Sequence, residues 1–317
     1  MRILITGGTG FVGVHLIRLL KTRDSEISVL ASGNPSSREH GVQYHEIDIR
    51  DAERVRSLVH EVNPDQIYHL AGITAVDASW VRPRLTYEVN VFGALNLFEA
   101  AMDLPVAPRI LNVSTSQVYA AASGILTEAS PLRPDNPYAA SKAMAELLVA
   151  QYRNRETGGI VTARPFNHTG CGQLPNFVLP SIAKQFAEIE RGLRPPKLSL
   201  GNTSVRRDFT DVRDVVRAYS LLVDRGRTWD VYNVCSGTAV LLSDIIRMFQ
   251  AISGIDVTIE IDRNKVRPAE VAEIYGDPGK LQSETGWQRQ IPLQETVEGM
   301  LDFWRSQCLH QDPKPEV

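Results

Sequence analysis

The segment Arg2-Ile3-Leu4-Ile5-Thr6-Gly7-Gly8-Thr9-Gly10-Phe11-Val12-Gly13 joins a short apolar run to the start of a helical pattern through a glycine-rich turn. Glycines at positions 7, 10 and 13 allow a tight turn and let a phosphate group approach the backbone closely. The free amides and the dipole of a helix N-terminus favour the negative charge of that phosphate. A glycine turn with a purely structural role is the alternative. The segment therefore predicts a dinucleotide site, to which we assign Gly7, Gly10, Phe11, Val12 and Gly13.

A short apolar run followed by a longer stretch of helical spacing recurs through the first half of the chain. Strands are predicted at residues 2–6, 27–31, 42–47, 66–71, 109–114 and 159–164. Helices are predicted at residues 11–21, 52–62, 83–102 and 138–154. The alternation predicts the α/β class, as a doubly wound parallel sheet of the Rossmann type with a smaller, mixed α/β lobe.

Glycines and prolines interrupt this alternation after residue 164. Within residues 209–236, a helical run and a strand at 231–234 are expected to return to the main sheet. We therefore assign residues 1–166 and 210–236 to the dinucleotide-binding domain, and residues 167–209 and 237–317 to the smaller lobe.

Composition limits the classes of partner. The chain has 317 residues, of which 43% are hydrophobic and 22% charged, with a formal net charge of −3. Because basic and acidic residues are interspersed, we expect neither nucleic acid nor a membrane surface as a partner. Three widely spaced cysteines favour neither a disulfide framework nor a zinc site, and no metal is expected. The first apolar run ends long before the length of a signal peptide or membrane span, which predicts a cytoplasmic protein.

The residues after the second predicted strand bear on which dinucleotide binds. The stretch Val29-Leu30-Ala31-Ser32-Gly33-Asn34 lacks the acidic residue that holds a ribose 2′-hydroxyl, which favours NADP(H) over NAD. Ser32 and Arg38 are assigned to the 2′-phosphate, although Arg38 could equally be a solvated loop charge. Asp48 could hydrogen-bond the adenine or cap the helix that starts near Asp51, and the two roles are compatible.

Tyr138 and Lys142 lie four residues apart in Asn136-Pro137-Tyr138-Ala139-Ala140-Ser141-Lys142, at the start of a predicted helix. This spacing places both side chains on one helix face. A tyrosine titrates at about pH 10, so its use as an acid or base at neutral pH needs a group that stabilises the phenolate, such as an adjacent ammonium. An amphipathic helix with an exposed lysine is the alternative. The segment Val113-Ser114-Thr115-Ser116-Gln117 ends the fifth strand and supplies hydroxyls at the edge where such sheets bind ligands.

Several motifs together resemble the extended short-chain dehydrogenases/reductases that act on nucleotide sugars. They are the glycine turn, His69-Leu70-Ala71-Gly72, Asn90-Val91-Phe92-Gly93, the Ser-Thr-Ser segment and the Tyr-x-x-x-Lys pair. The resemblance covers nearly the whole chain and implies hydride transfer between a nicotinamide and a sugar carbon. By this resemblance Tyr138 is the acid/base, and Thr115 hydrogen-bonds the reacting oxygen. Lys142 lowers the pKa of the tyrosine and holds the nicotinamide ribose. The further cofactor contacts that it implies are Ile49, Leu70, Ala71, Gly72, Val113, Pro165, Asn167 and His168. For His168 we favour loop packing over a direct catalytic role.

Motifs downstream of residue 164 resemble the GDP-sugar branch, which contains GDP-mannose 4,6-dehydratases and GDP-4-keto-6-deoxy-D-mannose reductases. By that resemblance the smaller lobe binds a GDP-sugar. The implied contacts are Asn176, Arg207 and Arg267 at the diphosphate, Glu270 at the ribose, and Val178 and Lys197 near guanine. Further implied substrate contacts are Thr74, Thr115, Ser116, Gln117, Asn167 and Lys184. Arginine suits phosphate because its planar donors match the oxygens bidentately. A solvated salt-bridge face at residues 206–214 is the alternative, and we place Arg206 there.

Reduction and dehydration of the sugar need different groups. In the related 4,6-dehydratases a glutamate two residues after the catalytic threonine is the base, and Gln117 stands in that place here. An amide cannot accept a proton as a carboxylate does. We therefore predict an NADPH-dependent reductase that converts the C4 ketone of GDP-4-keto-6-deoxy-D-mannose to GDP-D-rhamnose, with its C4 epimer left open. The alternatives are an NDP-sugar 4-epimerase, a dehydratase in which Glu128 reaches C5, and a non-catalytic nucleotide sensor.

Two further expectations concern the oligomeric state and the role of Cys171. In relatives, the helices corresponding to residues 83–102 and 138–154 form the four-helix bundle of a homodimer. The apolar positions that permit this pairing are Leu95, Phe98, Met144, Leu147 and Leu148, although they could instead face the sheet. The family's Asn-His-x-Gly-Pro-Gly reads Asn167-His168-Thr169-Gly170-Cys171-Gly172 here, and we interpret Cys171 as a small apolar substitute rather than a reactive thiol.

Overall fold

The structure is a computed structural model that describes residues 1–33, 38–120, 122–153, 158–262 and 271–309. Its strands are β1 (Arg2–Thr6), β2 (Glu26–Ala31), β3 (Val42–Glu46), β4 (Gln66–His69), β5 (Arg109–Val113), β6 (Gly124–Leu126), β7 (Gly159–Pro165), β8 (Asn167–Thr169), β9 (Lys197–Leu200), β10 (Arg206–Asp211), β11 (Val231–Val234), β12 (Ala239–Leu241), β13 (Thr258–Ile261) and β14 (Glu273–Gly276). Its α-helices are α1 (Phe11–Leu20), α2 (Ala52–Val62), α3 (Val76–Val81), α4 (Pro83–Tyr87), α5 (Gly93–Met102), α6 (Pro137–Gln151), α7 (Val178–Glu190), α8 (Val212–Arg225), α9 (Leu242–Ser253), α10 (Gly279–Thr285) and α11 (Leu293–Cys308).

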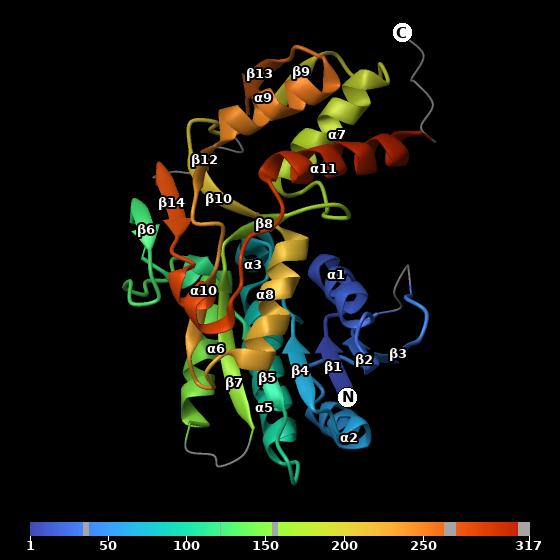
Figure 1. The fold of residues 1–317 in the computed structure, drawn as a ribbon, viewed down its shortest axis with the longest axis vertical. Helices are drawn as coiled ribbons and strands as arrows, with labels where there is room; N and C mark the ends of the chain where they lie inside the picture. Colours follow the sequence, from blue (N-terminus) through green and yellow to red (C-terminus); the bar gives the residue numbers. More distant parts are fainter. Residues whose placement is uncertain (34–37, 121, 154–157, 263–270, 310–317) are drawn as a thin grey trace.

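Seven parallel strands form the central sheet in the order β11-β7-β5-β4-β1-β2-β3 (Figure 1). Strand β1 is in the middle, and its last residue, Thr6, lies opposite Leu30 of β2 and His69 of β4. Because parallel strands end at one edge, the glycine turn after β1 and the segments after β4 and β5 lie along the same edge. The predicted doubly wound parallel sheet is confirmed, and the strand at 231–234 returns to it beside β7.

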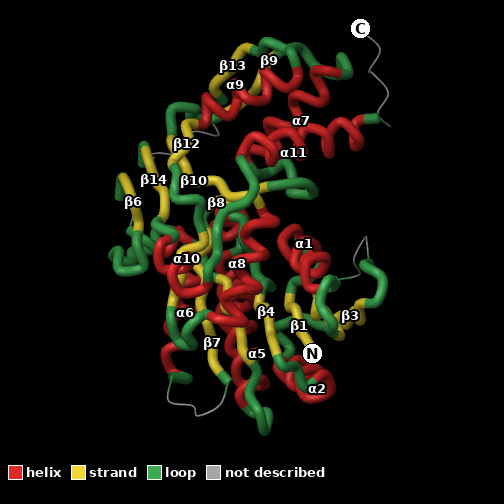
Figure 2. Tube along the Cα trace, in the orientation of Figure 1, coloured by secondary structure: helices red, strands yellow, loops and turns green. Residues whose placement is uncertain are grey.

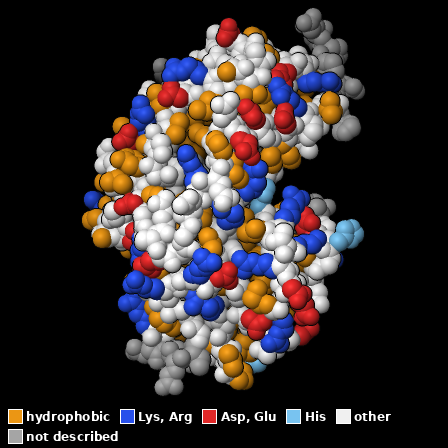
Figure 3. Space-filling model, viewed as in Figure 1, with side chains coloured by type: hydrophobic (Ala, Val, Ile, Leu, Met, Phe, Trp, Pro, Cys, Tyr) orange, Lys and Arg blue, Asp and Glu red, His pale blue; other side chains and the backbone are white. Residues whose placement is uncertain are grey.

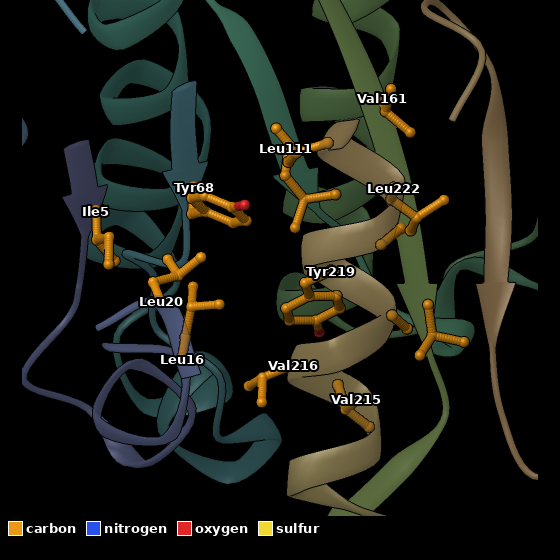
Figure 4. Close-up of a cluster of buried hydrophobic side chains, with 14 of the residues drawn as sticks. Ile5, Leu16, Leu20, Tyr68, Leu111, Val161, Val215, Val216, Tyr219 and Leu222 are labelled. Carbon is orange, nitrogen blue, oxygen red and sulfur yellow. The ribbon is translucent and has the colours of Figure 1, made fainter. Parts of the chain in front are cut away.

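Helices cover both faces of this sheet. Figure 4 shows one core, in which Leu16 and Leu20 of α1 and Val215, Val216, Tyr219 and Leu222 of α8 pack with Ile5, Tyr68, Leu111 and Val161 of the strands. On the opposite face, α2, α5 and α6 bury side chains that include Val55, Leu97 and Ala145. Burial of each large apolar side chain contributes about 1.5–3 kcal/mol, so the two layers hold the edge of the sheet in a fixed place.

The predicted helix at 83–102 is wrong in its middle, because the structure divides it into α4, a π-helical segment (Glu88–Phe92) and α5. The wide π turn carries Asn90, whose side chain accepts from the Ile73 amide at 2.8 Å and donates to the Ile73 carbonyl at 3.0 Å. At Gly93 a Cβ would lie 2.7 Å from the Ile49 side chain, so glycine allows the close packing of α5 there. Apolar spacing cannot reveal one extra residue in a turn, which is why the sequence predicted a continuous helix.

The rest of the chain builds a smaller lobe, at the top of Figure 2. Its sheet has the order β12-β10-β14-β6, with β8 paired to β10 and a separate β9–β13 pair. Helices α7, α9 and α11 share a core that includes Phe186, Phe249 and Met300. Strand β6 pairs with β14 in this lobe, and α10 packs on α8 and β11 of the main sheet, so contacts cross the division made from the sequence. The division into two domains stays a prediction.

Asp208 of β10 ties the small lobe to the end of the main sheet. Its buried carboxylate accepts hydrogen bonds from the amides of Ser236 at 2.8 Å, Gly237 at 3.0 Å and Gly276 at 3.4 Å. Among the described residues, no helix has both the length and the apolar character that crossing a membrane requires.

Candidate active site

The glycine turn has the geometry that a dinucleotide site needs. Gly7 has a φ of 70°, and a Cβ there would lie 2.7 Å from the Ala71 amide nitrogen. A Cβ on Gly13 would lie 2.5 Å from the Cα and the carbonyl oxygen of Gly8. Gly10 is the N-cap of α1 and has no side chain to cap the first amides, which leaves a dipole end for an anion. The turn therefore fits a dinucleotide pyrophosphate, next to the predicted contacts Phe11 and Val12.

The segment after β4 is fastened to this turn. His69, which is 1% exposed, shares a hydrogen bond of 2.8 Å between its Nδ1 and the Thr6 hydroxyl, and that hydroxyl accepts from the Ala71 amide at 3.2 Å. Burial lowers the pKa of His69 to about 3, and the Lys142 ammonium acts in the same direction, so the ring is neutral. Leu70, Ala71 and Gly72, which were assigned to the cofactor, are thus held beside the glycine turn.

The residues predicted to distinguish NADP from NAD lie in the connection between β2 and β3. Ser32 follows β2 and is exposed. Arg38 is also exposed, and its guanidinium lies over the Tyr44 ring at 5.5 Å from the centroid. The contact of either side chain with a 2′-phosphate stays a prediction.

One of the two roles suggested for Asp48 is wrong. The N-cap of α2 is Asp51, whose carboxylate accepts from the Arg54 amide at 3.1 Å. Asp48 instead pairs with Arg50 at 2.5 Å, and this bond lowers the pKa of its carboxyl. The cap falls to Asp51 because only the residue directly before the helix has its side chain beside the first free amides. Ile49 is buried and packs against α5.

The sequence-predicted catalytic side chains meet at the edge of the sheet, and all are buried. Thr115 follows β5, while Tyr138 and Lys142 occupy the first two turns of α6; they are 5%, 7% and 4% exposed. The Tyr138 hydroxyl is hydrogen-bonded to Thr115. Lys142 Nζ donates to the carbonyl of Val113 at 2.8 Å. The start of α6 is fixed because Asn136 accepts from the Ala139 amide at 2.9 Å, directly before a proline at the first helical position.

The lowering of the Tyr138 pKa by Lys142 stays a prediction, because burial dominates the pKa of this tyrosine in the structure. Burial raises the Tyr138 pKa above its ordinary value, and the hydrogen bond with Thr115 offsets only part of that effect. The cause is desolvation, which disfavours a phenolate, while the Lys142 ammonium is bonded to Val113 rather than to the phenol. Burial also lowers the pKa of Lys142 to about 8, and the Glu146 carboxylate opposes this shift.

Gln117 lies beside this centre in the place where a dehydratase would carry its base. It is exposed at the edge, in the short 3-10 helix Ser116–Val118, and its side-chain oxygen accepts from Asn136 at 3.3 Å. Glu128, the other carboxylate considered for that task, accepts from the Asn233 amide at 2.7 Å. Ser116, the remaining hydroxyl of the segment, is half-buried, and Thr74 is exposed in the loop after β4.

The segment after β7 lies beside the start of α1. Pro165 is buried, and Asn167 donates to the Asp208 carbonyl at 3.2 Å. The His168 ring stacks on Phe11 at 6.4 Å between centroids, and its Nδ1 hydrogen-bonds to the Phe166 carbonyl at 3.0 Å. Burial lowers the pKa of His168. These contacts agree with a packing role for His168.

The predicted substrate residues are spread over the small lobe. Asn176 and Val178 are exposed at the start of α7. Lys184 pairs with Glu188 at 2.7 Å, and Lys197 pairs with Glu260 at 2.7 Å. Arg207 is half-buried on β10 and donates to the Arg206 carbonyl at 2.8 Å. Arg267 and Glu270 lie outside the described residues. All these substrate roles stay predictions.

The cleft side of the molecule is hollowed between the two lobes (Figure 3). A pocket of about 290 Å³ there is lined by residues of both lobes, among them His15, Gly170, Cys171, Asp211 and Glu295. Cys171 donates to the Gly299 carbonyl at 3.1 Å, and burial raises the pKa of its thiol. A thiol with a raised pKa is a poor nucleophile, in agreement with the interpretation of Cys171 as a non-reactive substitute.

Two groups that sequence reasoning did not assign also belong to the site. Asn90, in the π-helical turn, donates to the Ser141 hydroxyl at 2.8 Å and holds the loop before α3. Glu146 forms a buried ion pair with Arg164 one turn beyond Lys142. The spacing of four residues between Lys142 and Glu146 was a signal for the second group, because it places both on one face of α6.

The parallel seven-strand sheet, the glycine turn and the buried tyrosine–lysine pair define an enzyme of the short-chain dehydrogenase/reductase type. More narrowly, the chain belongs to the GDP-mannose 4,6 dehydratase family, whose model matches residues 4–300. It is an NAD(P)-dependent nucleotide-sugar oxidoreductase of this type.

Three known proteins illustrate the similarity. GDP-6-deoxy-D-mannose reductase of Pseudomonas aeruginosa is 34% identical over 96% of this chain and 97% of its own. GDP-6-deoxy-D-talose 4-dehydrogenase of Aggregatibacter actinomycetemcomitans is 31% identical over 90% of this chain and 92% of its own. The structure of RMD from Pseudomonas aeruginosa complexed with NADPH superposes with a TM-score of 0.84, at 32% identity, over 96% of this chain and 99% of that one.

Proposed function

We propose that this protein reduces the C4 ketone of GDP-4-keto-6-deoxy-D-mannose with NADPH, and that GDP-D-rhamnose is the product. The observation that carries the proposal is Gln117, an amide at the position of the dehydratase base. Glu128 gives no replacement for that base, since its carboxylate is engaged by the Asn233 amide. The similarity to a GDP-6-deoxy-D-mannose reductase supports the same substrate class.

The chain's own residues supply the proton and the orientation. When bound, NADPH supplies the hydride. Tyr138 donates its phenol proton to the C4 oxygen, and its raised pKa suits this direction because the phenol is fully protonated at neutral pH. Thr115, already bonded to Tyr138, holds the same oxygen. Lys142, fixed at the Val113 carbonyl, holds the nicotinamide ribose. Its positive charge offsets the negative charge that the tyrosine acquires as it ionises.

NADP(H) as the specific cofactor, and the GDP group of the substrate, are part of this proposal. The end of β2 carries Ser32 and no acidic residue, and a similar protein was solved with NADPH. A cytoplasmic location is proposed from the three cysteines, Cys171, Cys235 and Cys308, all of which are free thiols. None of these points depends on the stereochemistry at C4.

We also propose a homodimer through the outer face of α6. Met144 and Leu147 are 45% and 68% exposed there, beside a groove of about 560 Å³ that reaches Trp229. Phe98, named with them from the sequence, is fully buried against the sheet and cannot take part. Leu147→Glu should convert the dimer to a monomer in light scattering, and a wild-type monomer would exclude the dimer.

The deciding experiment measures NADPH oxidation with 4-keto-6-deoxy sugars that carry GDP, UDP or dTDP, and resolves each product by NMR. We expect turnover with the GDP sugar and a reduced C4. Formation of a 4-keto-6-deoxy product from GDP-mannose alone would identify a dehydratase instead. A protein that is purified with tightly bound NAD and inactive with added NADPH would be a 4-epimerase.

A further inference from the structure

A buried ion pair lies directly behind the catalytic centre. The side chains of Glu146 on α6 and Arg164 on β7 are 9% and 5% exposed. Arg164 Nη2 donates to Glu146 Oε2 at 2.6 Å, and Arg164 Nε donates to Oε1 at 3.0 Å, so the pair is bidentate. The Ser114 hydroxyl donates to Glu146 Oε1 as well. The carboxylate therefore receives three hydrogen bonds, two from Arg164 of β7 and one from Ser114, the residue after β5.

Two side chains of α6, one turn apart, form hydrogen bonds with consecutive residues at the end of β5 and just after it. Lys142 donates to the carbonyl of Val113, and Glu146 accepts from the hydroxyl of Ser114. The next residue is Thr115, whose side chain is bonded to Tyr138. The clamp thus fixes the position of Thr115 relative to the helix that carries the tyrosine and the lysine.

Arg164 joins this clamp to the smaller lobe. Its guanidinium lies over the Tyr119 ring at 4.8 Å and also donates to the Glu128 carbonyl at 3.4 Å. The Tyr119 hydroxyl donates to the Asn233 side chain at 2.6 Å, and Asn233 donates to the Leu126 carbonyl at 2.9 Å, at the end of β6. Burial of two charges is costly, and apolar residues of similar size are often as stabilising. A contribution to stability therefore does not by itself explain this buried ion pair.

We propose that Glu146, held in place by Arg164, is a positioning residue that sets its carboxylate one helical turn from Lys142 and fixes Thr115 beside Tyr138. The inference deepens the proposed function and rests on it, because it concerns how the same site holds its cofactor and transfers a proton.

The charges around Lys142 support this assignment. Tyr138 lies one turn before it on α6, His69 faces it from β4, and Arg164 lies behind Glu146 on β7. His69 is neutral, with a pKa of about 3. Burial lowers the Lys142 pKa to about 8, and Glu146 is the carboxylate that opposes it. Removal of the Glu146 charge should therefore lower the pKa of Lys142 further and discharge the lysine at a lower pH.

The test compares Glu146→Gln with Glu190→Gln. Glu190 forms a bidentate pair with Arg305 in the smaller lobe, at 2.6 Å and 2.8 Å, and it touches nothing in the site. The pH profiles of NADPH oxidation and of NADPH affinity, measured by cofactor fluorescence, are recorded for both variants. We expect Glu146→Gln to move the alkaline limb of both profiles to lower pH by about one unit. Glu190→Gln should leave both limbs where they are in the wild type.

The two readouts separate this inference from the proposed function. If no keto sugar oxidises NADPH but the affinity limb moves as expected, the substrate assignment fails and the role of Glu146 stands. If Glu146→Gln loses rate or stability while both limbs stay in place, the residue is merely structural and the inference is overturned. Should Glu146→Gln fail to fold, Glu146→Gln/Arg164→Met leaves no buried charge unpaired. Its affinity limb should move in the same direction but by less, because the Arg164 charge is removed as well, and an unmoved limb would overturn the inference.

Discussion

Replacement of Tyr138 by phenylalanine removes one hydroxyl from the centre of the site and keeps the ring. A positioned acid contributes about 100- to 10,000-fold to the rate, which corresponds to about 3–5 kcal/mol of activation free energy. The loss of stability should be much smaller, about 1 kcal/mol, because the ring is 7% exposed and only the bond to Thr115 is lost. Turnover should therefore collapse while the fold and NADPH affinity persist.

The assay follows the loss of NADPH absorbance with the keto sugar in excess, together with thermal unfolding and NADPH titration. Tyr68→Phe is the matched control, because Tyr68 is fully buried in β4 and its hydroxyl donates to the Gln66 side chain at 3.2 Å. It should lose similar stability and no rate. Comparable turnover in the two variants would refute proton transfer from Tyr138.

Three other perturbations have definite expected results. Lys142→Met should slow turnover and weaken NADPH binding, each by about tenfold or more, since one ammonium serves both; an unchanged dissociation constant would contradict this. Gly13→Ala places a Cβ 2.5 Å from Gly8, so a loss of about 1–3 kcal/mol in unfolding free energy and weaker NADPH binding are expected by urea denaturation and titration. His69 has its pKa lowered to about 3 by burial and by Lys142, so the unfolded state takes up the proton first on acidification. Its contribution to stability is present above about pH 6.5 and is lost as the pH falls towards 3, by about 2 kcal/mol at about pH 5. His69→Gln should flatten the dependence of unfolding free energy on pH in that window, and an unchanged slope would refute the buried neutral ring.

The fold and the centre of the site were predictable from local patterns. The apolar runs predicted most of the parallel strands with bounds close to those observed, because strands covered on both faces are rich in apolar residues. Glycines 7 and 13 were identifiable because the turn leaves no space for a Cβ. The spacing of Tyr138 and Lys142 placed them on one helix face before any tertiary contact was known.

Other features depended on contacts between distant segments. The strand at 124–126 pairs with β14, about one hundred and fifty residues later, and nothing in its own sequence indicates that partner. The π turn at Asn90 lies directly before Gly93, which packs against Ile49 from a distant segment of the chain.

The sequence alone determined which residues share an element: the parallel sheet, the glycine turn and the helix that carries the tyrosine and the lysine. The tertiary structure decided what those residues are bonded to and how far they are removed from water. It placed the Lys142 ammonium at Val113, raised rather than lowered the pKa of Tyr138, and brought Glu146 to Arg164. The physical reason is that residue spacing fixes local geometry, whereas desolvation and charge pairing depend on whichever segments pack around a group.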